Sequence, residues 1–151
     1  MNDTTARLSA MREGGRRLAT VKAALRDFTE VGTTFREIEA EAQRLIKEAD
    51  AEPNFAMVDG YHWATCTMRN DELCHGIPDR DITVEAGDII SIDVGLLYNG
   101  YHLDTSITFP VGEIPAEKQE FLDVGKKSLR KAINKAKVGN SVYEISAAMQ
   151  R

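Results

Sequence analysis

The chain has 151 residues, of which 42% are hydrophobic and 28% are charged, and its formal net charge is −5 at pH 7. This length predicts a single domain with a sizeable buried core, and the acidic balance argues against direct binding to nucleic acid or to an anionic membrane. The sequence has no long apolar run and no apolar stretch near its first residues. We therefore expect a cytoplasmic protein without a secretory signal or a membrane segment.

Apolar residues at helical spacing predict two helices before Pro53. The first contains Gly14-Gly15, which admits close packing, and Val31-Gly32 ends it. A capping box from Thr34 to Glu37 opens the second helix. The apolar stripes are Leu8, Met11, Leu18, Val21, Leu25 and Phe28 in the first helix, and Phe35, Ile38, Ala42, Leu45, Ile46 and Ala49 in the second. We expect the remaining glutamates of this region to be solvated charges: Glu39, Glu41, Glu48 and Glu52.

Short strands and turns replace the helical pattern between residues 54 and 111. The clearest element is a β-hairpin over residues 89–109, in which Asn99-Gly100 tolerates the positive φ angles of a two-residue type I′ turn. The register that follows pairs Tyr98 with Tyr101, Asp93 with Ser106, and Gly95 with Asp104. Because side chains alternate along a strand, one face of the hairpin is apolar and the other is polar. The polar face carries Ser91, Asp93, Gly95, His102, Asp104 and Ser106.

Asp93 and Asp104 become diagonal neighbours on the polar face, roughly 7–8 Å apart at Cα. That spacing lets two short carboxylates share one or two cations. The simpler alternative is a solvated face, but aspartate is depleted in strand interiors, and such a face more often carries Lys, Thr, Arg and Glu. Gly95 leaves room for something to approach Asp104, which favours a binding site.

Two further helices are predicted after Pro115, the second opened by a capping box from Ser141 to Glu144. The inward positions of the third helix are Phe121, Leu122, Leu129, Ala132, Ile133 and Ala136. The junction at residues 138–145 repeats the one at residues 31–38, which indicates either an internal repeat or a coincidence of helix caps. About sixty residues of strand follow the first copy. We therefore expect the apolar side of the fourth helix to pack against a similar sheet, which this chain does not contain. That side carries Val142, Ile145 and Met149.

Three segments together identify a resemblance: Cys74-His-Gly-Ile-Pro78, Ser91-Ile-Asp-Val-Gly95 and Gly100–Phe109 closely resemble type I methionine aminopeptidases. The resemblance runs from the helix at Met11–Arg16 to the last residue. It implies an α+β pita-bread fold with helices on one face of a mainly antiparallel, curved sheet. Residues 1–151 would then form a single catalytic domain whose carboxy-terminal portion is missing, with a first half at 1–112 and the start of a second, pseudo-symmetric half at 113–151.

The resemblance also implies an active site, with two divalent ions (Mn, Fe, Co or Zn) held by two Asp, one His and two Glu. Asp93 and Asp104 match the two aspartate ligands, and His75 matches the histidine that hydrogen-bonds the scissile amide. Cys66 and Tyr61 match positions that line the pocket for the methionine side chain. The metal-binding histidine and both glutamates of the family lie beyond residue 151.

The implied function is removal of the initiator methionine from nascent proteins, with a water activated by two metals attacking the first peptide bond. Its partners would be the amino termini of nascent polypeptides and, through them, the ribosome, and the full-length enzyme would be a monomer. With an incomplete ligand set, we expect this chain alone to be inactive or weakly active. Two departures concern the site: residues 58–63 differ from the usual Tyr-His-Gly-aromatic-Pro segment, and Leu103 stands where glycine is usual.

Other interpretations stay open. A proline-directed aminopeptidase or prolidase of the same fold shares the two-aspartate hairpin, although His-Gly-Ile-Pro argues against it. A non-catalytic half-fold that binds a partner is motivated by apolar surface on the last two helices. His102 is interpreted as a neighbour of the site and His62 as a surface residue. Cys66 and Cys74 are expected to be reduced, half-buried thiols, and a Cys74–His75 nucleophile is disfavoured because strand neighbours point to opposite faces.

Overall fold

A computed structural model describes residues 3–150 of the chain. It divides into two units, Met1–Glu113 and Ile114–Arg151, which are described separately. Within the described residues, no helix is both long and apolar enough to cross a membrane.

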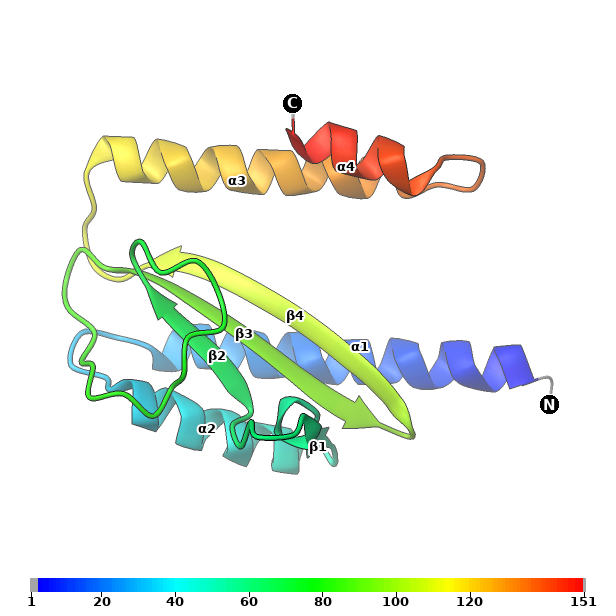
Figure 1. The fold of residues 1–151 in the computed structure, drawn as a ribbon, viewed down its shortest axis with the longest axis horizontal. Helices are drawn as coiled ribbons and strands as arrows, with labels where there is room; N and C mark the ends of the chain where they lie inside the picture. The colour runs from blue at the N-terminus through cyan, green and yellow to red at the C-terminus, as the bar shows by residue number, and fades with distance from the viewer. Residues whose placement is uncertain (1–2, 151) are drawn as a thin grey trace. The chain divides into compact units, whose positions relative to one another are not determined.

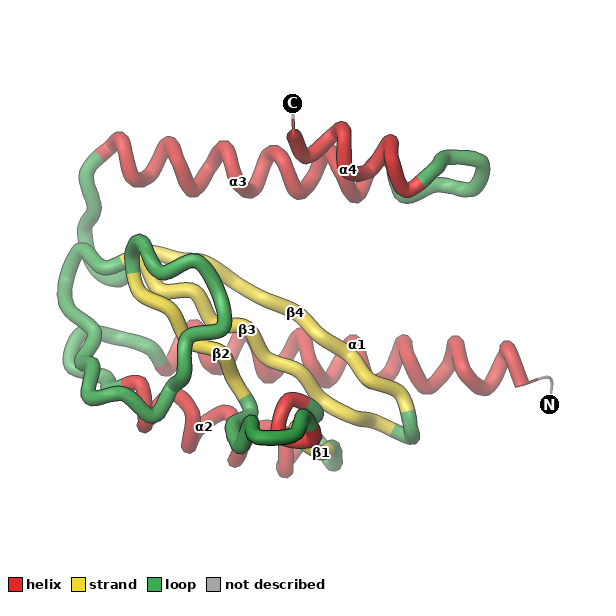
Figure 2. The backbone as a smooth tube through the Cα atoms, in the orientation of Figure 1, coloured by secondary structure: helices red, strands yellow, loops and turns green. Residues whose placement is uncertain are grey.

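The first unit contains a four-stranded antiparallel sheet built around a central strand, β3 (Ile89–Tyr98). Strand β4 (Tyr101–Pro110) pairs with β3 along its whole length. Strands β2 (Thr65–Arg69) and β1 (Glu52–Pro53) pair with different parts of β3. A short 3₁₀ helix, η1 (Phe55–Met57), follows β1. Figure 2 shows the long loop that joins β2 to β3 in green.

Two helices, α1 (Asp3–Phe28) and α2 (Phe35–Glu48), cover one side of this sheet (Figure 1). Helix α1 lies against β3, β4 and α2, whereas α2 lies against β1 and β2. The core between helices and sheet is fully apolar at its centre, with Leu25, Phe35, Ile38, Ala42, Ile46, Val84, Ile90, Ile92, Val94 and Leu96 buried. The predicted α+β arrangement, with helices on one face of an antiparallel sheet, is confirmed for this unit.

The capping box that opens α2 is also confirmed. The Thr34 hydroxyl accepts a hydrogen bond from the Glu37 amide at 3.2 Å, and the Glu37 carboxylate accepts one from the Thr34 amide at 2.7 Å. These two bonds satisfy amide groups that the first turn of a helix leaves without intrahelical partners.

Helix α1 approaches the hairpin closely because Gly14 has no side chain. A Cβ atom at this position would lie 2.6 Å from Leu103 Cδ1 and 3.2 Å from Tyr98 Cβ. Leu103 points to the helix-covered face, as the predicted register requires, and packs against the core. The expectation that Gly14-Gly15 admits close packing is therefore confirmed.

The predicted hairpin register is confirmed at each pair. Asn99 and Gly100 both have positive φ, 49° and 80°, as a type I′ turn needs. The observed pairs are Tyr98 with Tyr101, Asp93 with Ser106, and Gly95 with Asp104. The face toward the helices is buried along β3 and mostly half-buried along β4, and both aspartates lie on the opposite side of the sheet, which α1 and α2 leave uncovered.

The second unit is a helical hairpin of α3 (Ala116–Lys135) and α4 (Val142–Gln150). The Ser128 hydroxyl donates to the Met149 carbonyl at 2.7 Å and ties the two helices together. The predicted capping box at Ser141 forms only in part. The Glu144 carboxylate accepts from the Ser141 amide at 2.8 Å, but the Ser141 hydroxyl donates to that carboxylate, and the Glu144 amide donates to the Ser141 carbonyl.

The predicted inward face of α3 is largely wrong for this unit. Leu122 and Ala132 are buried, but Phe121 is 72% exposed and Ile133 is 61% exposed; Leu129 and Ala136 are exposed as well. Helical periodicity identifies an apolar stripe without showing what covers it, and within this unit only α4 packs on α3. On the apolar side of α4, Val142 and Met149 are exposed, as expected, whereas Ile145 is half-buried.

The two helix junctions resemble each other in backbone conformation. Gly32 and Gly139 have φ angles of 96° and 91°, in the left-handed region that glycine adopts without a steric penalty. Two positions after each glycine stands a hydroxyl residue, Thr34 or Ser141, whose amide donates to the carboxylate of the glutamate three positions further on.

Candidate active site

Asp93 and Asp104 lie together on the uncovered face of the hairpin. Asp93 is half-buried and Asp104 is exposed, and their carboxyl groups are close enough to share a hydrogen bond. Burial raises the pKa of Asp93 to about 6, and the charge of Asp104 and the shared hydrogen bond add to the shift, whereas nearby His75 opposes it. A carboxyl group whose charged form is destabilised by burial and by a second acid is typical of a functional site, such as one that binds a cation.

The structure brings all five residues singled out in the sequence to one cleft. This cleft has a volume of about 400 Å³. Its lining residues are Phe55, Val58, Tyr61, Cys66, His75, Ile77, Asp93 and Asp104. They come from η1 and the segment that follows it, from β2, from the β2–β3 loop and from both arms of the hairpin. The cleft thus combines an apolar wall with a pair of carboxylates.

Tyr61 and Cys66 form an uncharged part of that wall. The Tyr61 hydroxyl donates to the Thr65 carbonyl at 2.6 Å and lies 3.2 Å from Cys66 Sγ. Burial raises the pKa of Tyr61, and burial also raises the pKa of the Cys66 thiol. Both groups are therefore neutral at neutral pH, which suits contact with an apolar side chain and does not suit a thiolate nucleophile.

The other polar candidates differ in their surroundings. His75 is exposed on the β2–β3 loop and adopts a positive φ of 55°. His102 shares the polar face of the hairpin and is exposed, as is His62. Both cysteines are free, as expected, but neither is half-buried: Cys66 is buried in β2, and Cys74 is exposed on the loop between β2 and β3.

Glu39 corrects the sequence interpretation, since it is only 6% exposed. Its carboxylate accepts hydrogen bonds from the Ala64 amide at 2.7 Å, the Thr65 amide at 3.0 Å and the Thr65 hydroxyl at 2.7 Å. A signal was present in the sequence, because Glu39 follows Phe35 by four residues and so falls on the buried stripe of α2. Glu39 fixes the start of β2, directly beside Tyr61 and Cys66.

Asn54 explains why position 95 carries glycine. A Cβ atom at Gly95 would collide with Asn54 Oδ1 and would lie 2.7 Å from a ring carbon of Phe55. Asn54 is buried and donates from Nδ2 to the Leu103 carbonyl at 3.1 Å. The space that was predicted to admit a ligand beside Asp104 is therefore filled by the chain itself. Gly95 lets the η1 segment close over the sheet and place Phe55 in the cleft.

The carboxylate pair fits part of a metal site. Carboxylate oxygens are ligands for hard and borderline divalent cations, and the mutual repulsion of Asp93 and Asp104 would be relieved by a bound cation. Across residues 3–150, no group of three or more His, Cys, Asp or Glu side chains is arranged to hold a metal ion. Asp93 and Asp104 are therefore a pair of carboxylates that could contribute to a metal site without forming a complete one.

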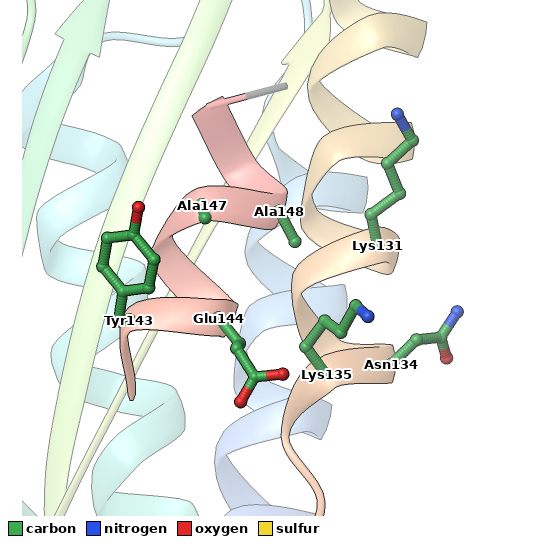
Figure 3. Close-up of a pocket in the computed structure, with 7 residues that line it drawn as sticks. All are labelled: Lys131, Asn134, Lys135, Tyr143, Glu144, Ala147 and Ala148. Atoms are coloured by element: carbon green, nitrogen blue, oxygen red, sulfur yellow. The ribbon is translucent and has the colours of Figure 1, made fainter. Parts of the chain in front are cut away.

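A second hollow lies within the helical hairpin and has different chemistry (Figure 3). Its lining residues are Lys131, Asn134, Lys135, Tyr143, Glu144, Ala147 and Ala148. Figure 3 shows a single carboxylate, Glu144, on the same side as Lys135, and Tyr143 directed away from α3. This hollow lacks the paired acids of the cleft between η1 and the hairpin.

Comparison with known proteins decides the family. Residues 9–151 match the sequence model of metallopeptidase family M24. The chain belongs to this family. It is 39% identical over 147 residues to methionine aminopeptidase 1 of Bacillus subtilis, a match that covers 97% of this chain and 59% of that protein.

Solved structures similar to this chain identify its fold. The crystal structure of methionine aminopeptidase from Thermotoga maritima matches with a TM-score of 0.90 and 31% identity, over 94% of this chain and 57% of that one. Prolidase from Pyrococcus furiosus matches with a TM-score of 0.82 and 25% identity, over 95% of this chain and 41% of that one. The predicted pita-bread fold is confirmed, and the chain spans less than two thirds of these relatives.

Proposed function

We propose that this chain carries one side of the active site of a metal-dependent methionine aminopeptidase, which removes the initiator methionine from nascent proteins. The observation that carries the proposal is the cleft that joins the Asp93–Asp104 pair to His75 and to the wall of Tyr61 and Cys66. The M24 family and the relatives named methionine aminopeptidase support it. Residues 113–151 would begin a second, pseudo-symmetric half.

Each residue of the cleft has a distinct role in this proposal. Asp93 and Asp104 would hold two divalent ions, whose identity among Mn, Fe, Co and Zn the ligand types leave open. When bound, such ions polarise the scissile carbonyl and activate a water molecule. Tyr61 and Cys66, which are both neutral, would contact the methionine side chain from the wall of the cleft. His75 would hydrogen-bond the scissile amide and stabilise charge that develops on it.

The chain alone would have little or no activity. Two carboxylates hold a cation weakly, and a site that is open on one side neither excludes water nor fixes the geometry of a substrate. The partners of the whole enzyme would be the amino termini of nascent polypeptides, close to the ribosome in the cytoplasm, with the enzyme acting as a monomer.

Binding of a methionine side chain tests the proposal without requiring turnover. Titration of the chain with L-methioninamide in the presence of Zn²⁺, a diamagnetic ion, should shift NMR signals of Tyr61 and Cys66, whereas glycinamide, the matched control, should not. Turnover of a Met-Ala peptide by the chain with Mn²⁺ or Co²⁺ should be weak or absent. Robust turnover that is abolished by Asp93→Asn would contradict the proposal that this chain carries only one side of the active site. Equal signal shifts with both amides would contradict the proposal that Tyr61 and Cys66 contact a methionine side chain.

Two other functions have specific support. The similarity to a prolidase favours a proline-directed enzyme of the same fold, and preferential binding of Ala-Pro over L-methioninamide would select it. The exposed apolar side chains of α3 and α4, such as Phe121 and Val142, favour a non-catalytic binding module. A compact monomer that binds no hydrophobic dye would exclude that module.

A further inference from the structure

We propose that Arg80 is a positioning residue for His75. Its guanidinium group fixes the loop between β2 and β3 against the sheet and thereby sets the imidazole beside Asp93 and Asp104. This inference rests on the proposed function of the cleft, since it assigns a purpose to the position of His75.

His75 occupies a backbone conformation that needs external support. Its φ of 55° lies in the left-handed region, which is strained for a residue with a side chain. The segment from Asn70 to Arg80 forms no helix or strand, and His75 itself is exposed. The position of the imidazole is therefore determined by how the rest of this loop is held.

The residue after His75 touches the sheet directly. The Thr67 amide in β2 donates to the Gly76 carbonyl at 2.9 Å. A Cβ atom at Gly76 would collide with the Thr67 carbonyl and would lie 3.0 Å from a guanidinium nitrogen of Arg80. Glycine at this position lets the loop and the guanidinium meet at the same edge of β2.

The Arg80 side chain joins three parts of the chain at that edge. It donates from Nε to the Ile77 carbonyl at 2.8 Å, on the far side of His75, and from Nη2 to the Thr67 carbonyl at 2.9 Å. Both terminal nitrogens also bond the Glu72 carboxylate, on the near side of His75. The guanidinium carbon lies 5.3 Å from the centre of the Phe35 ring. One side chain thus holds both ends of the His75 loop on β2.

The strength of this junction follows from its chemistry. A guanidinium that bonds a carboxylate through two nitrogens forms short, charge-assisted hydrogen bonds of defined geometry. The hydrogen bonds from Arg80 hold the pKa of Glu72 below its usual range, and the Glu72 carboxylate also accepts from the Arg69 amide at 2.8 Å. A lysine at position 80 would supply one point charge and would not reproduce the fork.

A second arginine, Arg36 of α2, also pairs with a residue of this loop and provides a contrast. Arg36 pairs with Asp79 at 2.7 Å, but the two side chains are 60% and 56% exposed. The Arg80 and Glu72 side chains are 31% and 35% exposed, and their junction includes backbone carbonyls of the strand and of the loop. Exposed pairs contribute little to structure, so Arg36 serves as the matched control for Arg80.

Paramagnetic NMR measures the proposed effect without turnover. Bound Mn²⁺ broadens the signals of nearby protons, and the broadening falls steeply with distance. The chain has only three histidines, so the His75 imidazole signal is assigned from the variants His62→Gln and His102→Gln. Broadening of this signal at a fixed fraction of bound Mn²⁺ reports how close His75 lies to the carboxylate pair.

We expect a severalfold loss of His75 broadening in Arg80→Gln and a smaller loss in Arg80→Lys. The Mn²⁺ affinity, measured by calorimetry, should stay within about twofold, because Arg80 makes no hydrogen bond to the hairpin that carries both aspartates. Glu72→Gln removes only the ion pair of Arg80 and should cause an intermediate loss of His75 broadening. If Arg80→Gln does not fold, Glu72→Gln serves as the test of the inference. Arg36→Gln should leave the broadening unchanged.

Equal broadening in the original chain and in folded Arg80→Gln would overturn the inference, as would an equal loss in Arg36→Gln. A failure of the proposed function looks different. In that case the original chain would bind no Mn²⁺ at Asp93 and Asp104, or would bind it there without broadening His75.

Discussion

Replacing Asp93 with asparagine should stabilise the metal-free chain at neutral pH. Burial and the neighbouring Asp104 raise the pKa of Asp93 from 3.8 to about 6 in the folded chain. Between these two values the folded chain retains a proton that the unfolded chain releases, so the free energy of unfolding falls as the pH rises through this window. Above about pH 6 the whole penalty is present, and Asp93→Asn removes it.

The size of the effect follows from the shift. Two pKa units correspond to about 3 kcal/mol, but Asp93 is only half-buried and solvent screens its charge, so we expect about 1–2 kcal/mol. The asparagine side chain of the variant lacks the charge at every pH, so its other effects on packing stay nearly constant. The informative quantity is therefore the change in the stability difference between pH 4 and pH 7.5.

Urea unfolding in EDTA at a series of pH values measures this quantity. The stability gained by Asp93→Asn should be close to zero at pH 4 and should increase through pH 6 to its full value by pH 7.5. Asp81→Asn, which removes an exposed carboxylate, should show no such increase. A stability difference for Asp93→Asn that is independent of pH, or that turns more unfavourable as the pH rises, would refute the reasoning.

Three further predictions concern packing and reactivity. Gly14→Ala should lower the free energy of unfolding, measured with urea, by about 1–3 kcal/mol, because the added methyl group meets Leu103. In a Leu103→Ala background this loss should largely disappear. Equal losses in the two backgrounds would contradict the contact. Glu39→Gln should lower the free energy of unfolding by about 1–3 kcal/mol, because an amide cannot accept all the hydrogen bonds that the carboxylate accepts. The same change at an exposed glutamate of α2 should have little effect. A thiol reagent should modify Cys74 rapidly and Cys66 only on unfolding; equal rates in the folded chain would contradict the burial of Cys66.

The hairpin was predictable because its information is local. Asn99 and Gly100 select one turn type, that turn selects the register, and strand alternation then sends Asp93 and Asp104 to one face. The start of α2 was predictable for the same reason, since a capping box lies within four consecutive residues.

Other features depend on contacts between distant parts of the chain. The burial of Glu39 became evident only once β2 placed three donors against its carboxylate. The filled space at Gly95 required Asn54, which no local pattern relates to the hairpin. The exposed face of α3 was misassigned because an apolar stripe shows which side seeks a partner and not whether the chain provides one.

The residues of the candidate site likewise differ in how they could be predicted. Alternation and turn chemistry indicated Asp93 and Asp104 as a pair, whereas Tyr61, Cys66 and His75 were indicated by family resemblance alone. The structure gathers all of them around one cleft. The position of His75 depends on Arg80, which joins segments on both sides of it through backbone carbonyls that carry no sequence signal.

Calorimetric titration with Mn²⁺ tests most directly the claim that Asp93 and Asp104 form one side of a metal centre. We expect weak, saturable binding to the chain, weakened by at least about tenfold in both Asp93→Asn and Asp104→Asn, a loss of the size seen even for indirect partners of a metal. Asp81→Asn should bind as the original chain does. Binding that survives both substitutions at the hairpin, or that is absent from the original chain at millimolar Mn²⁺, would contradict the account.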